Sequence, residues 1–164
     1  MSKGSGTCGD DGRADEVARA SAKAMWATDV ASQKLGIKIE EVRRGYARLA
    51  MLLTPAMANG HGLAHGGYIF TLADSAFAFA CNTYDERAVA QQCSITFLRP
   101  GKVGRRLVAE AREVARAGRS GIYDVTVSDG TETIAEFRGH SRLIGGALVQ
   151  KPYAKPHGKA GEEA

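Results

Sequence analysis

Residues Tyr68–Asn82 form a segment that is apolar around most of its circumference when it is drawn as an α-helix. A helix of this kind is normally buried, and its four alanines let other backbones approach closely: Ala73, Ala76, Ala78 and Ala80. Polar residues interrupt the segment at Thr71, Asp74 and Ser75, so it falls short of the roughly 18 apolar residues that cross a membrane. The rest of the chain must therefore enclose this helix.

The segments around this helix have other periodicities. Ala14–Leu35 has the spacing of a helix, and Ile37–Arg43 and Tyr46–Leu53 are expected to be strands because apolar and charged residues alternate in them. Four more strands are expected after the apolar helix, with a hairpin turn at Asp129-Gly130: Gln92–Phe97, Leu107–Val114, Tyr123–Ser128 and Thr131–Ile144. This order predicts an α+β domain in which an antiparallel sheet wraps one helix.

The chain has 164 residues, which suggests a single domain of ordinary size. We expect a flexible N-terminal tail at residues 1–13, the folded domain at 14–145, and a flexible C-terminal tail at 146–164, which is rich in Gly, Lys, Pro and Ala. The start of the chain lacks the apolar core of a signal peptide, so export is not expected. The three cysteines leave one over in any disulfide scheme, which favours a cytoplasmic protein.

The net charge of +4 fits a nucleic acid, an anionic membrane or a phosphorylated small molecule as partner. Arginines are spread along most of the chain, no run of basic residues is longer than two, and aromatic residues make up only 7%. These features favour a phosphorylated ligand over nucleic acid, and we expect neither nucleic-acid nor membrane binding.

Asp74 conflicts with its apolar surroundings. A buried carboxylate is costly unless it is hydrogen-bonded or functional, and burial raises its pKa toward the range of a general base. The alternative is that Asp74 caps a helix that begins at Ser75, since aspartate is a favoured N-cap residue.

Gly66-Gly67 stands where the apolar helix is expected to begin. A helix N-terminus presents free backbone N–H groups, and glycine lets a ligand atom approach them. Such a donor stabilises the oxyanion of acyl transfer, typically by about 3 kcal/mol. The alternative is an ordinary glycine turn between two elements.

The chain offers little support for other chemistries. His61 and His65 are four residues apart, but no H-E-x-x-H pattern or third ligand accompanies them, so no metal is expected. No G-x-S-x-G pattern marks a serine nucleophile. Cys81 and Cys93 lie among apolar residues and are interpreted as buried thiols, without a setting that would activate them.

Several separated segments together resemble the phenylacetic-acid-degradation thioesterases of the hotdog superfamily. The most specific segment is His65-Gly66-Gly67-x-x-Phe70-x-Leu72-Ala73-Asp74, which follows Asn59-Gly60-His61. Further matches lie at residues 76–82, 97–101, 121–125 and 137–139. The resemblance covers roughly residues 20–145.

This resemblance implies a hotdog fold, in which a curved antiparallel sheet wraps a long helix, here with an additional N-terminal helix. It also implies hydrolysis of acyl-CoA thioesters, often phenylacetyl-CoA or hydroxyphenylacetyl-CoA, in aromatic-acid catabolism, without a cofactor or metal. The expected assembly is a homodimer that pairs two sheets edge to edge, commonly doubled into a homotetramer. The active sites are then expected at the dimer interface.

The resemblance assigns a role to each residue of the site. Gly66 supplies the N–H that polarises the thioester carbonyl, Asn59 assists there or positions water, and His65 supports the loop. Asp74, reached from the other subunit, is the general base or the nucleophile. Relatives place a serine or threonine on the strand after the helix, where this chain reads Ala90-Gln91-Gln92-Cys93-Ser94, and Gln91 is taken as the residue that holds the water.

CoA carries phosphates, for which Arg119 resembles the binding position of the family, with Arg99 and Arg138 as further candidates. The alternative for each arginine is an ordinary solvated charge. A non-catalytic acyl-CoA sensor on the same fold remains an alternative function, although a sensor has no need of a buried carboxylate. A hotdog hydratase would use a D-x-N-P-x-H type of string, which this sequence does not contain.

Overall fold

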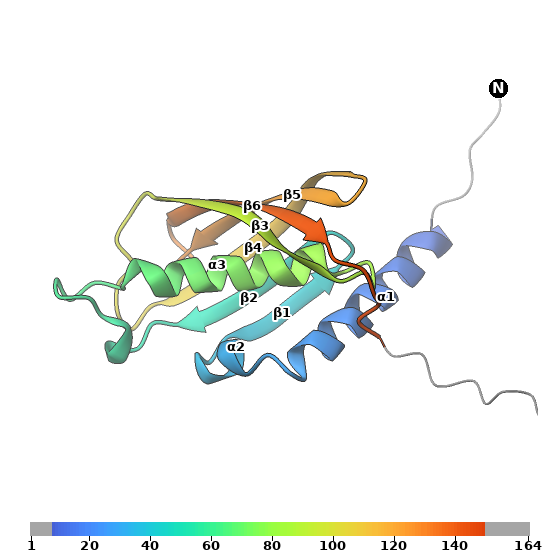
Figure 1. Cartoon of the computed structure of the whole chain (residues 1–164). Helices are drawn as coiled ribbons and strands as arrows, with labels where there is room; N and C mark the ends of the chain where they lie inside the picture. The colour runs from blue at the N-terminus through green and yellow to red at the C-terminus, as the bar shows by residue number, and fades with distance from the viewer. Residues whose placement is uncertain (1–7, 150–164) are drawn as a thin grey trace, which may run out of the picture.

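The structure is a computed structural model that describes residues 8–149 (Figure 1). Its elements follow the predicted order of helix, two strands, buried helix and four strands. They are α1 (Cys8–Trp26), α2 (Val30–Lys34), β1 (Lys38–Arg43), β2 (Tyr46–Leu52), the 3-10 turn η1 (Pro55–Met57), α3 (Gly66–Cys81), β3 (Ala88–Phe97), β4 (Arg106–Ala117), β5 (Ser120–Ser128) and β6 (Thr133–Leu143).

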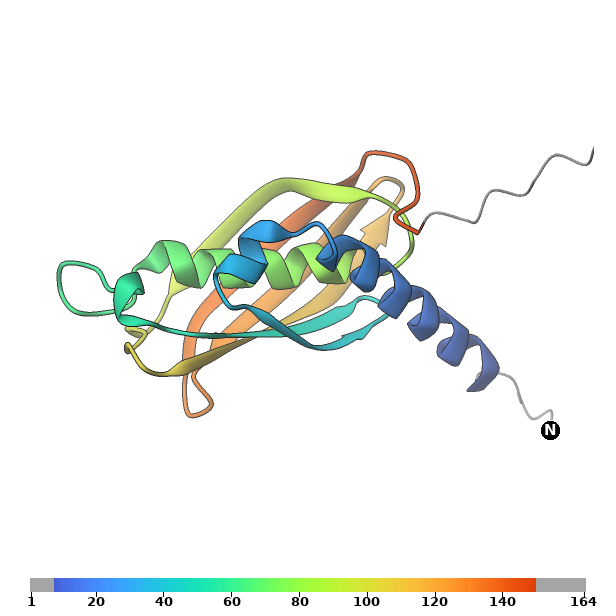
Figure 2. The same cartoon turned by 90° about the horizontal axis from the view of Figure 1, so that it is seen from below.

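The six strands form one sheet in the order β1-β2-β4-β5-β6-β3, and every neighbouring pair is antiparallel. The sheet curves around α3, and α2 lies beside α3 on the same face (Figures 1 and 2). This is the predicted hotdog fold. β3, the strand that follows α3 in the chain, lies at one free edge of the sheet.

Alternating residues of the central strands point toward α3 and build the core. They are fully buried: Leu49, Met51, Leu107, Ala109, Ala111, Tyr123, Val125 and Val127. On β6, Gly139 leaves space for α3, because a Cβ there would lie only 2.7 Å from the ring of Phe77. Ala73, Ala76 and Ala80 are completely buried in the helix. Small residues on both sides therefore bring α3 close to the sheet, as the alanines of this segment predicted.

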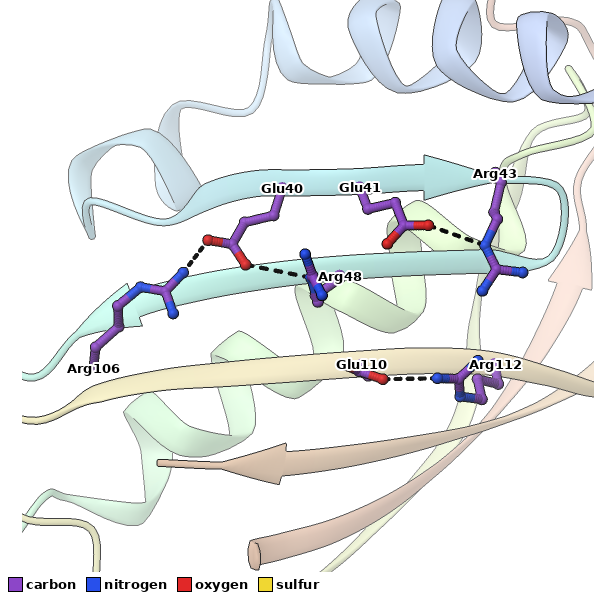
Figure 3. Close-up of polar contacts among 7 residues, drawn as sticks. All are labelled: Glu40, Glu41, Arg43, Arg48, Arg106, Glu110 and Arg112. Atoms are coloured by element: carbon purple, nitrogen blue, oxygen red, sulfur yellow. Dashed lines mark hydrogen bonds and ion pairs between the residues drawn. The ribbon is translucent and has the colours of Figure 1, made fainter. Parts of the chain in front are cut away.

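The opposite face of the sheet carries paired charges on β1, β2 and β4 (Figure 3). Glu40 pairs with both Arg48 and Arg106, Glu41 lies 3.1 Å from Arg43, and Glu110 lies 2.8 Å from Arg112. Ion pairs this exposed add little stability. Their consequence is electrostatic, since four arginines on this face are each paired with a carboxylate of one of three glutamates.

The prediction of one helix over Ala14–Leu35 is wrong in two respects. α1 begins at Cys8, six residues before the predicted start. The helix also ends at Trp26, and the Asp29 carboxylate starts α2 by accepting the Ser32 N–H at 3.0 Å. Residues 1–7 and 150–164 lie outside the described part.

No helix within residues 8–149 has both the length and the hydropathy that a membrane crossing requires.

Candidate active site

The first turn of α3 has one open backbone donor. His65 is the N-cap, and its ring atom Nδ1 accepts the Gly67 N–H at 3.0 Å, while its carbonyl accepts the Tyr68 N–H at 3.0 Å. The Gly66 N–H has no acceptor among residues 8–149. His65 thus accepts the backbone N–H groups of Gly67 and Tyr68 and leaves that of Gly66 available to a ligand.

Asn59 lies in the loop before α3. Its side-chain oxygen accepts the N–H groups of His61 at 2.9 Å and Leu63 at 3.2 Å, which closes the loop and fixes the orientation of the amide. Because the oxygen is occupied, the NH₂ end is the part of the side chain that remains free to donate.

An open groove of about 440 Å³ joins these donors to the end of β3. Its lining residues are Asn59, Leu63, Ala64, Gly66, Ile69, Phe97, Leu98, Arg99, Pro100 and Gly101. The structure therefore brings together Asn59 and Gly66, two of the residues predicted for the carbonyl-binding part of the site. A groove with two polar donors and otherwise largely apolar walls can hold an acyl carbonyl.

Asp74 lies half-buried in the middle of α3, which begins at Gly66. The alternative that Asp74 caps a helix starting at Ser75 is therefore wrong. Burial raises the pKa of the Asp74 carboxyl above its ordinary value, and a hydrogen bond from the Cys93 thiol opposes that rise. The distance from Cys93 Sγ to Asp74 Oδ1 is 3.9 Å. A carboxylate with a raised pKa in such a setting suits acid–base chemistry.

Asp74 and Gly66 of one chain do not form one site. They are separated by two turns of α3, about 12 Å along the axis at 1.5 Å per residue. A thioester carbonyl bound at the Gly66 N–H is out of reach of the carboxylate of the same chain, because a reacting atom needs to be within about 3.5 Å.

Gln91 occupies an irregular position in β3. The register with β6 shifts between Ala90 and Gln92, so Gln91 is the extra residue of a β-bulge and is exposed. Bulges often occur beside active sites, where they redirect a side chain. Within the described chain, the side chain of β3 that forms a hydrogen bond with Asp74 is that of Cys93. Sequence reasoning missed this contact, although the alternation of Cys93, Ile95 and Phe97 already placed Cys93 on one face with apolar residues.

Arg119 lies between β4 and β5, at the sheet end beside the C-terminus of α3. Its Nε and an Nη donate to the Leu143 carbonyl at 3.2 and 2.7 Å, and the rest of its exposed guanidinium faces solvent. No carboxylate within residues 8–149 forms a recorded ion pair with it.

The other two arginine candidates are engaged by acids. Arg99 lines the groove but lies 3.1 Å from Glu132. Arg138 contacts both oxygens of Asp124, at 2.6 and 2.7 Å, and this pair lowers the pKa of the aspartate. Their charges are therefore partly compensated within the chain, in contrast to that of Arg119.

Comparisons with known proteins identify the family of this chain. Residues 61–136 match the Thioesterase superfamily. The chain is 43% identical to the acyl-coenzyme A thioesterase PaaI of Escherichia coli (strain K12) over 129 residues, which cover 78% of this chain and 92% of that protein. The solved structure of E. coli PaaI, from the phenylacetic acid degradation operon, superposes with a TM-score of 0.79 at 42% identity, covering 81% of this chain and 97% of that chain. A Streptococcus mutans UA159 protein solved with acetyl CoA superposes with a TM-score of 0.65 at 28% identity, covering 68% and 90%.

Proposed function

Because the chain belongs to the thioesterase superfamily and is a thioester hydrolase, we propose that it cleaves aryl-acyl-CoA thioesters such as phenylacetyl-CoA or hydroxyphenylacetyl-CoA. The products are CoA and the free acid, formed in aromatic-acid catabolism. One observation carries the chemistry: a half-buried carboxylate with a raised pKa, Asp74, on a helix whose first amide, that of Gly66, is open to a groove.

In the proposed reaction the thioester oxygen accepts the Gly66 N–H, with the Asn59 amide as a second donor. These donors stabilise the negative charge that develops on the oxygen. The Asp74 carboxylate either removes a proton from an attacking water or attacks the carbonyl carbon itself, and in the second route water later hydrolyses the mixed anhydride left on Asp74. The C–S bond then breaks and the CoA sulfur takes up a proton. Gln91, on the bulge, is the proposed holder of the water.

We propose that a second copy of the chain completes each site. β3 is a free edge, none of its residues is charged, and Val89 and Phe97 are 45% and 50% exposed. Charges normally protect an exposed edge from pairing, so an edge without them invites a partner strand. Two β3 strands paired about a two-fold axis run antiparallel, so the two α3 helices also run antiparallel. We propose that the register of this pairing brings the Gly66 end of one α3 to the middle of the partner's α3. Doubling of this dimer gives the proposed tetramer.

The same pairing brings the Arg119 end of one sheet toward the Gly66 end of the other, since these lie at opposite ends of each sheet. Arg119 is therefore the proposed contact of the CoA phosphates, with Arg99 and Arg138 as secondary candidates. A structure solved with acetyl CoA among the relatives supports a CoA ligand. Cys81 and Cys93 are free thiols, which supports a reducing, cytoplasmic location.

The substrate proposal is tested by measuring thiol release from phenylacetyl-CoA, hydroxyphenylacetyl-CoA and a series of straight-chain acyl-CoA esters. We expect kcat/KM to be highest for the aryl esters, because apolar side chains such as Leu63, Phe97 and Leu98 wall the groove. Faster hydrolysis of straight-chain esters would reject the aryl preference and retain the thioesterase. Tight binding of acyl-CoA in calorimetry without hydrolysis would favour the sensor alternative.

The two-chain site is tested with hybrid dimers of tagged chains. A dimer of one Asp74→Asn chain and one Gly66→Pro chain retains one complete site if Gly66 and Asp74 come from different chains, so we expect roughly half of the wild-type activity per dimer. The matched control pairs a wild-type chain with a chain that carries both substitutions. That hybrid has no complete site and is expected to be nearly inactive. The reverse pattern would show that one chain holds the whole site.

A further inference from the structure

The contact between Asp74 on α3 and Cys93 on β3 is held in place by packing. Phe77 lies one turn after Asp74 and presses against Gly139 of β6, where a Cβ would come within 2.7 Å of its ring. Gly139 is the cross-strand partner of Cys93. The spacing between α3 and this part of the sheet is thus fixed at the level of the two side chains, and Cys93 Sγ lies 3.9 Å from Asp74 Oδ1.

The Cys93 thiol keeps its proton at neutral pH. Burial and the nearby Asp74 carboxylate both raise its pKa above that of a free cysteine. A thiolate at this position would face the negative charge of Asp74, which is the one charged group of residues 8–149 that acts on the pKa of Cys93. The group is therefore an S–H donor and not a nucleophile.

We propose that Cys93 is a positioning residue for the hydrolysis, whose thiol binds Asp74 Oδ1 and orients the carboxylate so that Oδ2 faces the substrate. This inference rests on the proposed function. The family resemblance placed the strand residue of the site at Gln91, whereas the described contact lies two residues further along β3. A hydrogen bond to one oxygen removes rotational freedom from the carboxylate, which matters because catalysis depends strongly on orientation.

Two titratable groups are coupled to the Asp74 carboxylate within residues 8–149: the Cys93 thiol on β3 and, through charge alone, the Cys81 thiol near the end of α3. From α2, the hydroxyl of Ser32 lies 3.2 Å from that of Ser75 beside Asp74, and it does not titrate. The inward-facing residues of β6 in this region, Phe137 and Gly139, carry no titratable group.

The rate of the wild-type protein is expected to fall as the pH drops through the pKa of Asp74, because protonation removes the base. The Cys93 hydrogen bond lowers that pKa, so Cys93→Ala should move the midpoint of the acidic limb to higher pH. We also expect kcat for phenylacetyl-CoA to fall about fivefold, as for loss of one hydrogen bond, with KM changed by less than about twofold. Cys93→Ser keeps a donor and should restore both properties toward the wild type.

Cys81→Ala is the matched control, since Cys81 is a buried thiol whose pKa burial raises to about 12 and whose Sγ lies 3.5 Å from the Ala78 carbonyl oxygen. It should leave the acidic midpoint and kcat at wild-type values. An unchanged midpoint in Cys93→Ala, or equal behaviour of the alanine and serine variants, would overturn the inference. If Cys93→Ala does not fold, Cys93→Ser decides, because a midpoint above that of the wild type would contradict donation.

The two proposals fail in different ways. A wild-type protein that hydrolyses no acyl-CoA in the panel removes the proposed function and this inference with it. An active wild type whose acidic limb is indifferent to residue 93 removes only the role of Cys93.

Discussion

Replacing Asp74 by asparagine is expected to lower kcat for phenylacetyl-CoA by about 10³-fold, within the range found for a positioned catalytic base. Asparagine has nearly the same size but neither removes a proton nor attacks a carbonyl. KM should change little, because the carboxylate acts on the reacting atoms and not on the CoA moiety. Thiol release under saturating substrate, followed with a thiol-reactive dye, measures this effect.

The fold should tolerate this substitution. Burial raises the pKa of Asp74, which means that the folded chain disfavours the charged carboxylate relative to the unfolded chain. A neutral asparagine removes that penalty, so the melting temperature at neutral pH should stay equal or rise. Glu136→Gln, which removes an exposed carboxylate hydrogen-bonded to Thr126, is the control with unchanged kcat. Full activity in Asp74→Ala would end the proposed mechanism.

Replacing Gly66 by proline is expected to lower kcat by about 10²-fold or more, because it deletes the N–H proposed to bind the oxyanion. Gly66 is the first residue of α3, a position where proline suits a helix. His65 has φ −66° and ψ 128°, the extended conformation that a residue before proline prefers. The substitution therefore removes a donor and preserves the backbone path. Single-turnover kinetics with phenylacetyl-CoA separate this loss from weaker binding.

Gly66→Ala provides the matched control. Its Cβ meets the same obstacle as that of proline, the Phe97 ring at 3.0 Å, but the N–H remains. We expect the alanine variant to lose far less activity than the proline variant. If both lose activity equally, crowding against Phe97 is the cause, and the amide of Gly66 has no catalytic part.

The buried helix with its isolated acid could be predicted from the sequence because it depends on local signals. An apolar segment with an isolated acid, preceded by two glycines, predicted a buried helix with an available backbone N–H at its N-terminus, and α3 has this form. The sheet was also predictable in outline, since alternation marks strands. The break at Ala27–Asp29 was not, because the apolar spacing continues across it while the cap of α2 depends on one hydrogen bond.

The contact between Cys93 and Asp74 could not be predicted in the same way. The bulge at Gln91 changes which residues of β3 face α3, and an alternating pattern does not reveal where an extra residue is inserted. Whether the charges of Arg99 and Arg138 are compensated likewise depends on pairing with distant residues. Arg99 pairs with Glu132, and Arg138 pairs with Asp124 on the neighbouring strand. Register and pairing over long distances set these features.

The separation of Gly66 and Asp74 along one helix makes the activity depend on the concentration of the protein. In the proposed two-chain site, a single copy carries both residues but forms no complete site, so turnover per molecule should vanish when dilution separates the chains. In a mixed dimer, a copy damaged at one of the two positions would still leave one complete site, whereas a copy damaged at both would also silence its healthy companion and cost more than its share of the output.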